Sequence, residues 1–187
     1  MLRTVLETAA ESFRAPREAA RRIAEVFTTL EGVGVLFGLA YCLNAILLTA
    51  AQLAFGREGA GGTLSFVVLN LVISGAAFVI LTGLVYGCGR LFGGTARLIE
   101  VAAVVAWHSL VTVPFTPFIA GGFDPASGEP GPGFLLQLAL IGVALWLLVN
   151  FVAEVHGFTN AWRVAGVMFA GLFMAGMILP ILFAGFI

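Results

Sequence analysis

The sequence predicts an all-α integral membrane protein with five transmembrane helices plus an amphipathic helical segment at the N-terminus. Two observations predict this fold class. The chain contains five long apolar runs separated by short polar segments, and 60% of its 187 residues are hydrophobic while only 10% are charged. A soluble core of this size would leave large apolar patches in water, so lipid is expected to cover the surface.

Each apolar run is near or above the roughly 20 residues that a helix needs to cross the hydrocarbon core of a bilayer. The predicted spans are residues 33–55, 64–87, 98–120, 134–155 and 164–187. The chain is therefore expected to consist of a cytoplasmic segment, residues 1–31, and a five-helix transmembrane domain, residues 32–187.

The orientation follows from the arginines, because the chain has no lysine. With a cytoplasmic N-terminus, the inner side would carry Arg3, Arg14, Arg17, Arg21, Arg22, Arg90, Arg97 and Arg163, which are eight of the nine arginines. Only Arg57 would lie outside. The positive-inside rule therefore predicts a cytoplasmic N-terminus and a periplasmic C-terminus. The net charge of −1 gives no reason to expect nucleic-acid binding.

The N-terminal segment has a helical apolar period on both sides of Pro16. Its apolar positions are Leu2, Val5, Leu6, Ala9 and Phe13 before the proline and Ile23, Val26, Phe27 and Leu30 after it. Pro16 suits the first position of a second helix, where its missing N–H costs nothing. Two interpretations remain open: a helix lying on anionic cytoplasmic lipid, or a helix docked on the ends of the spans. In the first, the lipid-facing side chains would be Arg14, Arg17, Arg21 and Arg22.

Proline and glycine predict local features of the spans. Pro114 and Pro117 should break the third span near its outer end, and Pro180 should kink the fifth. Two glycine pairs have the four-residue spacing that lets helices approach closely, namely Gly34 with Gly38 and Gly83 with Gly87. They are expected to serve packing within the chain, with a homo-oligomer interface as the alternative.

Polar residues inside the spans are the main functional candidates, because an ionisable group at bilayer depth is costly and usually has a reason to be there. Counting at about 1.5 Å per residue puts Asn44 and His108 near the midplane, with Ser74 arriving there from the other side. Glu100 lies just inside the cytoplasmic boundary. Glu154 approaches the same boundary from the fourth span, with Asn150 one turn deeper.

Two hypotheses explain these residues. In one, Glu100, Asn150 and Glu154 line a cytoplasm-facing cleft that ends at His108 and binds a cation, a proton or a polar lipid headgroup. In the other, the groups are satisfied locally. Glu100 would then pair with Arg97, Glu154 with Arg90 or Arg163, and His108 with Asn44 or a backbone carbonyl. We favour local pairing, because carboxylates at the boundary can be solvated.

Enzymatic activity is not expected. No serine lies in the Gly-x-Ser-x-Gly turn of a serine hydrolase, and His108 and His156, the two histidines, do not have the four-residue spacing of a zinc peptidase. A glycine-rich phosphate-binding loop would need a lysine after it, and the chain has no lysine. We expect no catalytic residue, no metal and no cofactor.

Three stretches of this chain resemble the Yip1 family, five-span membrane proteins with a bacterial branch related to Golgi proteins of eukaryotes. They are Phe13-Arg-Ala-Pro-Arg-Glu-Ala-Ala-Arg-Arg, Gly87-Cys-Gly-Arg-Leu-Phe-Gly-Gly-Thr-Ala-Arg leading into Glu100 and Ala-Val-Val-Ala-Trp, and Val155-His-Gly-Phe-Thr-Asn-Ala-Trp-Arg. The resemblance covers roughly residues 10–187 and implies a role in membrane organisation or transport. The Asp-Leu-Tyr-Gly-Pro motif of eukaryotic members is replaced by Phe13-Arg-Ala-Pro, so binding of Rab GTPases is not carried over.

The leading functional expectation is a non-enzymatic, multi-pass protein of the bacterial inner membrane with a membrane-organising role. Its partners would be the bilayer, anionic lipid headgroups, and a second copy of the chain or another membrane protein. The alternative is a small channel or transporter that moves a cation, a proton or a small polar solute through a polar cleft.

Overall fold

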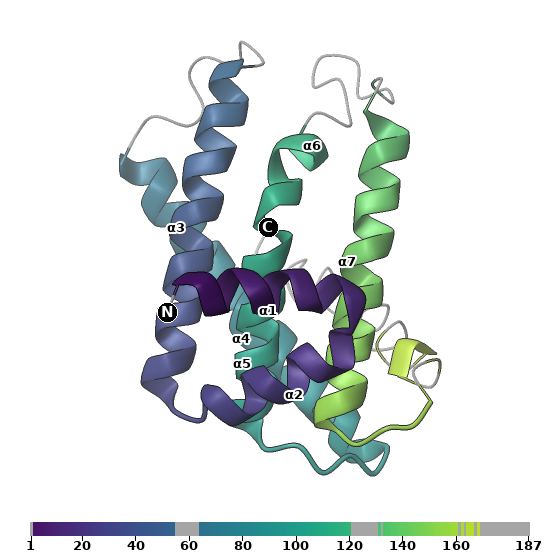
Figure 1. Ribbon diagram of the computed structural model, residues 1–187. Helices are drawn as coiled ribbons and strands as arrows, with labels where there is room; N and C mark the ends of the chain where they lie inside the picture. Colours follow the sequence, from purple (N-terminus) through teal and green to yellow (C-terminus); the bar gives the residue numbers. More distant parts are fainter. Residues whose placement is uncertain are drawn as a thin grey trace, which may run out of the picture.

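The all-α fold class is confirmed for the residues that a computed structural model describes, which are 2–54, 64–120, 131, 133–160, 162, 164–166 and 168. The helices are α1 (Leu2–Arg14), α2 (Pro16–Val26), α3 (Leu30–Ala54), α4 (Leu64–Leu91), α5 (Leu98–Thr112), the 3-10 helix η1 (Val113–Phe115), α6 (Thr116–Ala120) and α7 (Phe134–Val155) (Figure 1). Within the described residues, four segments are long and apolar enough to cross a membrane: residues 30–51, 68–91, 98–119 and 134–155. Most of the fifth predicted span, including Pro180, lies outside the described residues.

The third span is broken where the prolines predicted. Helix α5 ends at Thr112, Pro114 lies in the 3-10 turn η1, and α6 starts at Thr116 with Pro117 as its second residue. Proline lacks the N–H that an α-helix needs in its interior, and its ring clashes with the preceding turn. The chain therefore crosses this end of the span as two short helical pieces.

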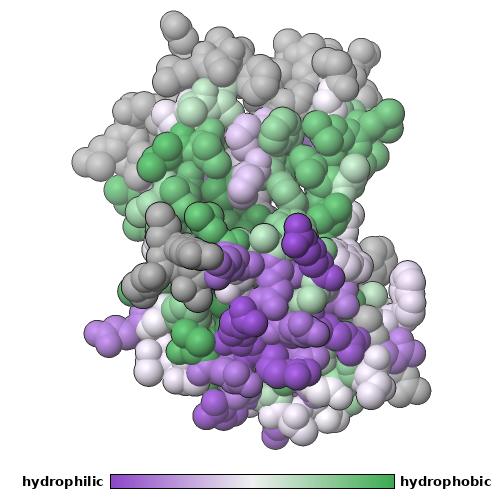
Figure 2. All heavy atoms as spheres, in the orientation of Figure 1, coloured by the Kyte–Doolittle hydropathy of each residue, from purple (hydrophilic) through white to green (hydrophobic). Residues whose placement is uncertain are grey.

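The two ends of the bundle differ in how they are packed. The residues of α5 from Val101 to Trp107 are buried except Ala102, and those of α7 are buried at Leu147, Leu148 and from Phe151 to Ala153. Nearer the other end, large apolar side chains of α3, α4 and α7 are exposed. Figure 2 shows this division as a hydrophobic upper half and a hydrophilic lower half, as expected of a chain whose upper half is covered by lipid.

The N-terminal helices pack on the bundle. Helix α1 crosses its face at mid-height, and α2 lies below it against α5 and α7 (Figure 1). Pro16 is the first residue of α2, as predicted. Ala19 and Ala20 are completely buried and Ile23 nearly so. Because alanine is small, α2 comes close to the two spans and shares their core.

Three arginine-bearing segments meet at the lower end of the molecule. The Thr95 N–H, between α4 and α5, donates to the His156 carbonyl beyond α7 at 3.3 Å. The Arg17 guanidinium of α2 donates to the Thr159 carbonyl, also at 3.3 Å. The segments that the arginine count assigned to one side of the membrane therefore lie together at one end of the bundle.

The expected packing role of the paired glycines is not found among the described residues. A methyl group added at Gly34, Gly38, Gly83 or Gly87 would meet no other described atom within 4 Å. Helix α3 instead buries Val33, Leu36 and Ala40, and Val33 and Leu36 belong to the same core cluster as residues of α5. Among the described residues, larger side chains make the contact between α3 and α5, on a different face of α3.

Candidate functional site

Glu154, at the end of α7, is held by Arg21 of α2. Its Oε1 atom accepts from Nη2 of Arg21 at 2.6 Å and from Nε at 2.8 Å. The hydrogen bond to Glu154, followed by its charge, raises the pKa of Arg21 above its ordinary value. The sequence suggested Arg90 or Arg163 as the partner. Arg21 takes this place because α2 is docked across the end of α7.

Glu100 forms a local pair with Arg97, as the second sequence hypothesis expected. Its Oε2 atom accepts from the backbone N–H of Arg97, and its Oε1 atom accepts from Arg97 Nε, both at 2.7 Å. Glu100 is the third residue of α5, so its carboxylate reaches back to the start of the helix as in a capping box. The carboxylate therefore stabilises the N-terminus of α5.

His108 and Asn150 bond to backbone carbonyls of α7. His108 Nε2 lies 2.9 Å from the Ala144 carbonyl oxygen. A carbonyl only accepts, so Nε2 carries the proton and joins α5 to α7. Asn150 Nδ2 donates to Trp146 of its own helix at 2.8 Å. Of the two partners that the sequence suggested for His108, the structure has the backbone carbonyl.

In the part of the chain that the structure describes, Glu100 and Glu154 line a different opening from His108. Glu100 and Glu154 line a groove of about 270 Å³ together with Arg21 and Arg97. His108 lines a separate cavity of about 370 Å³. Between Glu100 and His108, α5 contributes the buried run that ends at Trp107. Ligand binding by any of these residues remains a prediction.

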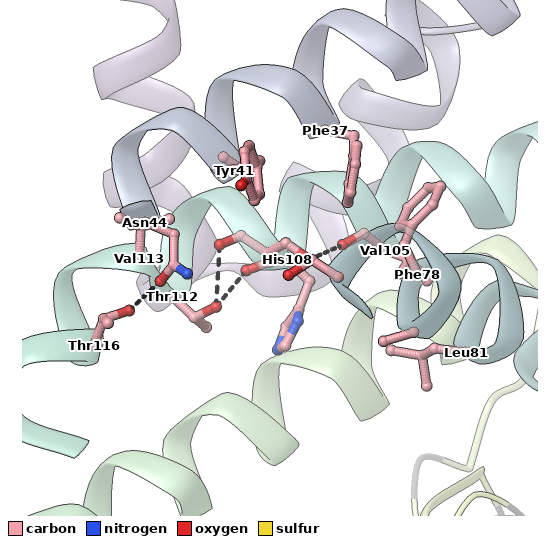
Figure 3. A pocket seen from close by; sticks show the side chains of 14 residues that line it. Phe37, Tyr41, Asn44, Phe78, Leu81, Val105, His108, Thr112, Val113 and Thr116 are labelled. Atoms are coloured by element: carbon pink, nitrogen blue, oxygen red, sulfur yellow. Dashed lines mark hydrogen bonds between the residues drawn. The ribbon is translucent and has the colours of Figure 1, made fainter. Parts of the chain in front are cut away.

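The cavity at His108 gathers the polar residues that counting placed near the midplane. Asn44 of α3, Ser74 of α4 and His108 of α5 all line it. The close-up in Figure 3 shows how Asn44, His108 and their labelled neighbours lie. Further polar side chains on its wall were not selected from the sequence: Tyr41, Ser109, Thr112 and Thr116. Ser109, Thr112 and Thr116 are three and four residues apart within an apolar run. This helical spacing could have predicted a polar face on the third span.

Sequence reasoning also missed a buried histidine at the lower end. His156 is 2% exposed, and its ring stacks on Phe158 with the centroids 5.6 Å apart. Gly89 and Gly94 make room for the ring, because a methyl group at either would lie 2.1 or 2.3 Å from its nearest atom. We call this arrangement the histidine cradle. It joins two of the stretches that carry the family resemblance.

The cradle leaves the His156 ring without a hydrogen bond in the described structure. Burial, and next the charge of Arg90, lower the pKa of His156 below its ordinary value, while Glu100 acts in the opposite direction. The Val85 carbonyl also favours the protonated ring without completing a geometrically sound hydrogen bond. Burial therefore favours the neutral form of the His156 ring, which packs in the cradle.

Among the described residues, no group of three or more His, Cys, Asp or Glu could hold a metal ion. The fold and these sites define a multi-pass helical membrane protein with an amphipathic helix pair docked across one end of its bundle. The chain belongs to the Yip1 family, since the model of the Yip1 domain matches residues 10–183. No curated protein and no solved structure matches the chain.

Proposed function

We propose that this protein organises the membrane around it by binding anionic lipid through the helix pair α1 and α2, without catalysis. The observation that carries the proposal is the position of α1, which crosses the bundle between its hydrophobic and hydrophilic halves (Figures 1 and 2). A helix at that level lies where lipid headgroups meet the acyl chains.

The side chains of α1 suit this position. Leu6 is 62% exposed and Phe13 40% exposed, and the Phe13 ring lies near that of Phe115 in η1, with the centroids 6.2 Å apart. Phe13 is thus on the side of α1 that faces the outer half of the bundle. Exposed apolar residues at the edge of an apolar belt favour insertion among acyl chains.

Basic side chains lie beside this apolar edge. Arg14, Arg21 and Arg22 are exposed and Arg17 is partly exposed. Arg21 also forms an ion pair with Glu154, and Arg22 forms one with Glu11 of α1. Of the arginines in the helix pair α1 and α2, Arg14 is best placed to bind a lipid phosphate, because it ends α1 at the turn into α2. Polybasic segments next to a membrane attract anionic headgroups.

Docking and lipid binding are compatible in this arrangement. The docking interpretation of the N-terminal segment accounts for its buried face, and the lipid interpretation accounts for Leu6, Phe13 and Arg14. A helix pair fixed to the bundle loses no orientational freedom when lipid binds, so its few charges act together. We place the protein in the bacterial inner membrane with the helix pair at the cytoplasmic leaflet.

Spin-labelled lipids test the proposal in vesicles that contain the full-length protein. Labelled phosphatidylglycerol should associate with the protein more strongly than labelled phosphatidylcholine, and 0.5 M salt should reduce the difference by screening. Arg14→Gln should lower the preference, whereas Arg90→Gln removes the same charge outside the helix pair and should lower it less. A wild-type protein without preference for the anionic lipid at low salt would contradict the proposal.

A small channel or transporter is the second candidate, and the polar cavity at His108 is the observation that favours it. Vesicles loaded with a pH-sensitive dye or a radiolabelled solute would test for movement across the membrane. Flux that depends on His108 would favour this function over the first.

A further inference from the structure

The cavity at His108 lies between three spans. Helices α3 and α4 each pack on α5 and touch each other little, and the space between them is the cavity of about 370 Å³. Pockets that hold small molecules commonly have volumes of about 300–1,000 Å³. The space is therefore large enough for a headgroup or part of an acyl chain.

The two ends of the cavity differ in chemistry. Phe37 and Phe78 pack ring to ring at the end nearer α2, with their centroids 4.7 Å apart, and Leu81 lies beside them (Figure 3). Asn44 and Thr116 face each other at the opposite end, nearer the outer side (Figure 3). An amphiphile whose headgroup points toward Asn44 and whose chain points toward Phe37 has the same polarity.

Three of the hydroxyl groups on the wall have already donated their protons. Ser109 donates to the Val105 carbonyl at 3.0 Å, and Thr112 donates to the His108 carbonyl at 2.8 Å. Thr116 donates to Asn44 Oδ1 at 2.6 Å. A hydroxyl has one proton and two lone pairs, so these oxygens can still accept. Asn44 adds amide N–H groups, and the wall therefore suits a ligand whose hydroxyls both donate and accept.

The wall carries no formal charge. None of the fourteen residues that line the cavity is Asp, Glu, Lys or Arg, and His108 is engaged with Ala144. A phosphate or an ammonium group at this depth would lack a counter-charge, which is costly inside a membrane. The ligand that fits is uncharged.

We infer that this cavity binds a neutral amphiphile with a hydroxyl-bearing headgroup, of the diacylglycerol or glycolipid class. The headgroup lies between Asn44, Thr112 and Thr116, and an acyl chain extends toward Phe37 and Phe78. The inference does not require the lipid-surface function, because no residue of α1 or α2 lines the cavity. It does not require transport through the same cavity either, because it is tested by binding alone.

The experiment uses the full-length protein in phosphatidylcholine nanodiscs, since alkyl glycoside detergents carry the same headgroup chemistry as the ligand. A diacylglycerol with a diazirine in one chain is added and irradiated, and the labelled peptides are mapped by mass spectrometry. The label should concentrate on peptides of α3, α4 and α5 that line the cavity. Unlabelled diacylglycerol should compete, while phosphatidylglycerol and free glycerol should not.

Variants separate this site from general lipid contact. Thr116→Val and Asn44→Leu each remove hydrogen bonds to the headgroup and should lower the labelling about 5- to 10-fold, as expected for the loss of one net hydrogen bond. Thr49→Val makes the same change on α3 outside the cavity and should leave labelling unchanged. Thermal unfolding of each variant shows whether it is folded. Both cavity variants also remove the hydrogen bond between Thr116 and Asn44, so each is compared with the wild type separately.

Three results would overturn the inference. The first is labelling spread evenly over exposed positions such as Leu135 and Leu145 of α7, which would indicate bulk lipid. The second is equal labelling of Thr116→Val and Thr49→Val. The third is competition by phosphatidylglycerol or by free glycerol as strong as that by diacylglycerol, which would exclude a neutral amphiphile as the preferred ligand.

Discussion

The indole N–H of Trp107 donates to the hydroxyl oxygen of Ser12 at 2.9 Å, across 95 residues of sequence. Both side chains are almost completely buried. Ser12 in turn donates to the Thr8 carbonyl of its own helix at 2.9 Å. This chain of two hydrogen bonds fixes α1 to α5 and holds the amphipathic helix at one height on the bundle.

Replacing Ser12 should therefore loosen α1. Ser12→Ala leaves the buried Trp107 N–H without a partner, which should lower the free energy of unfolding by about 1–3 kcal/mol. Ser109→Ala is the matched control, because its hydroxyl bonds only to the Val105 carbonyl of its own helix in the described structure. Thermal unfolding in detergent measures both. Equal losses of stability would contradict the role assigned to the bond between α1 and α5.

The histidine cradle predicts a sharp difference between two glycines of α4. Gly89→Ala would place a methyl group 2.1 Å from the His156 ring and should destabilise the protein by about 1–3 kcal/mol through overpacking. Gly87→Ala meets no described atom within 4 Å and should be neutral or slightly stabilising, because alanine favours a helix over glycine. The melting temperatures of the Gly89→Ala and Gly87→Ala proteins measure this difference. A Gly89→Ala protein as stable as Gly87→Ala would show that the cradle is not tightly packed.

Stability should fall in mild acid because of His156. Its folded pKa is lowered by burial, below the ordinary value of 6.5. The unfolded chain therefore takes up a proton on this ring at a higher pH than the folded chain does. The contribution of the neutral ring is fully present above about pH 6.5 and is lost as the pH falls toward the lowered folded pKa. The melting temperature should drop between pH 7.5 and pH 5.5, and less so in His156→Leu. An equal drop in both proteins would assign the effect to other groups.

The pair of Arg21 and Glu154 should respond to charge exchange. Arg21→Glu places two carboxylates at the contact and should weaken the docking of α2 on α7, as judged by faster proteolysis near residue 15. Adding Glu154→Arg to the same chain should restore protection, since the attraction returns with reversed polarity. The Arg21 side chain is exposed to solvent, so the difference in proteolysis between the single and double variants should be smaller at high salt. A double variant no better protected than the single one would show that the pair does not hold α2.

Membrane orientation can be tested with reporters. A reporter inserted between Arg90 and Arg97 should be cytoplasmic, because this loop shares one end of the bundle with α2 and the chain after α7. A reporter after Ile187 should be periplasmic if the chain crosses five times. The two fusions answer different questions, since the first tests the orientation and the second tests the number of spans. A periplasmic signal from the first would reverse the orientation proposed for the whole protein.

The sequence by itself determined the fold class, four of the helical spans, the start of α2 at Pro16 and the break in the third span at Pro114 and Pro117. These features are local or compositional. The length of an apolar run reflects the thickness of the bilayer, and proline ends a helix through its own covalent geometry. No knowledge of neighbouring helices is needed for either.

Only the tertiary structure decided which groups are partners. The sequence offered two positions for the N-terminal segment, and contacts of Ser12 and Arg21 with distant helices settled that it is docked. His156 carried no signal of its own, because its cradle is made by Gly89 and Gly94 more than sixty residues earlier in the printed sequence. Likewise, Asn44 and Thr116 share a cavity only because α3 and α6 pack side by side. Pairings of this kind depend on how helices are arranged in space, which the periodicity of a single helix does not contain.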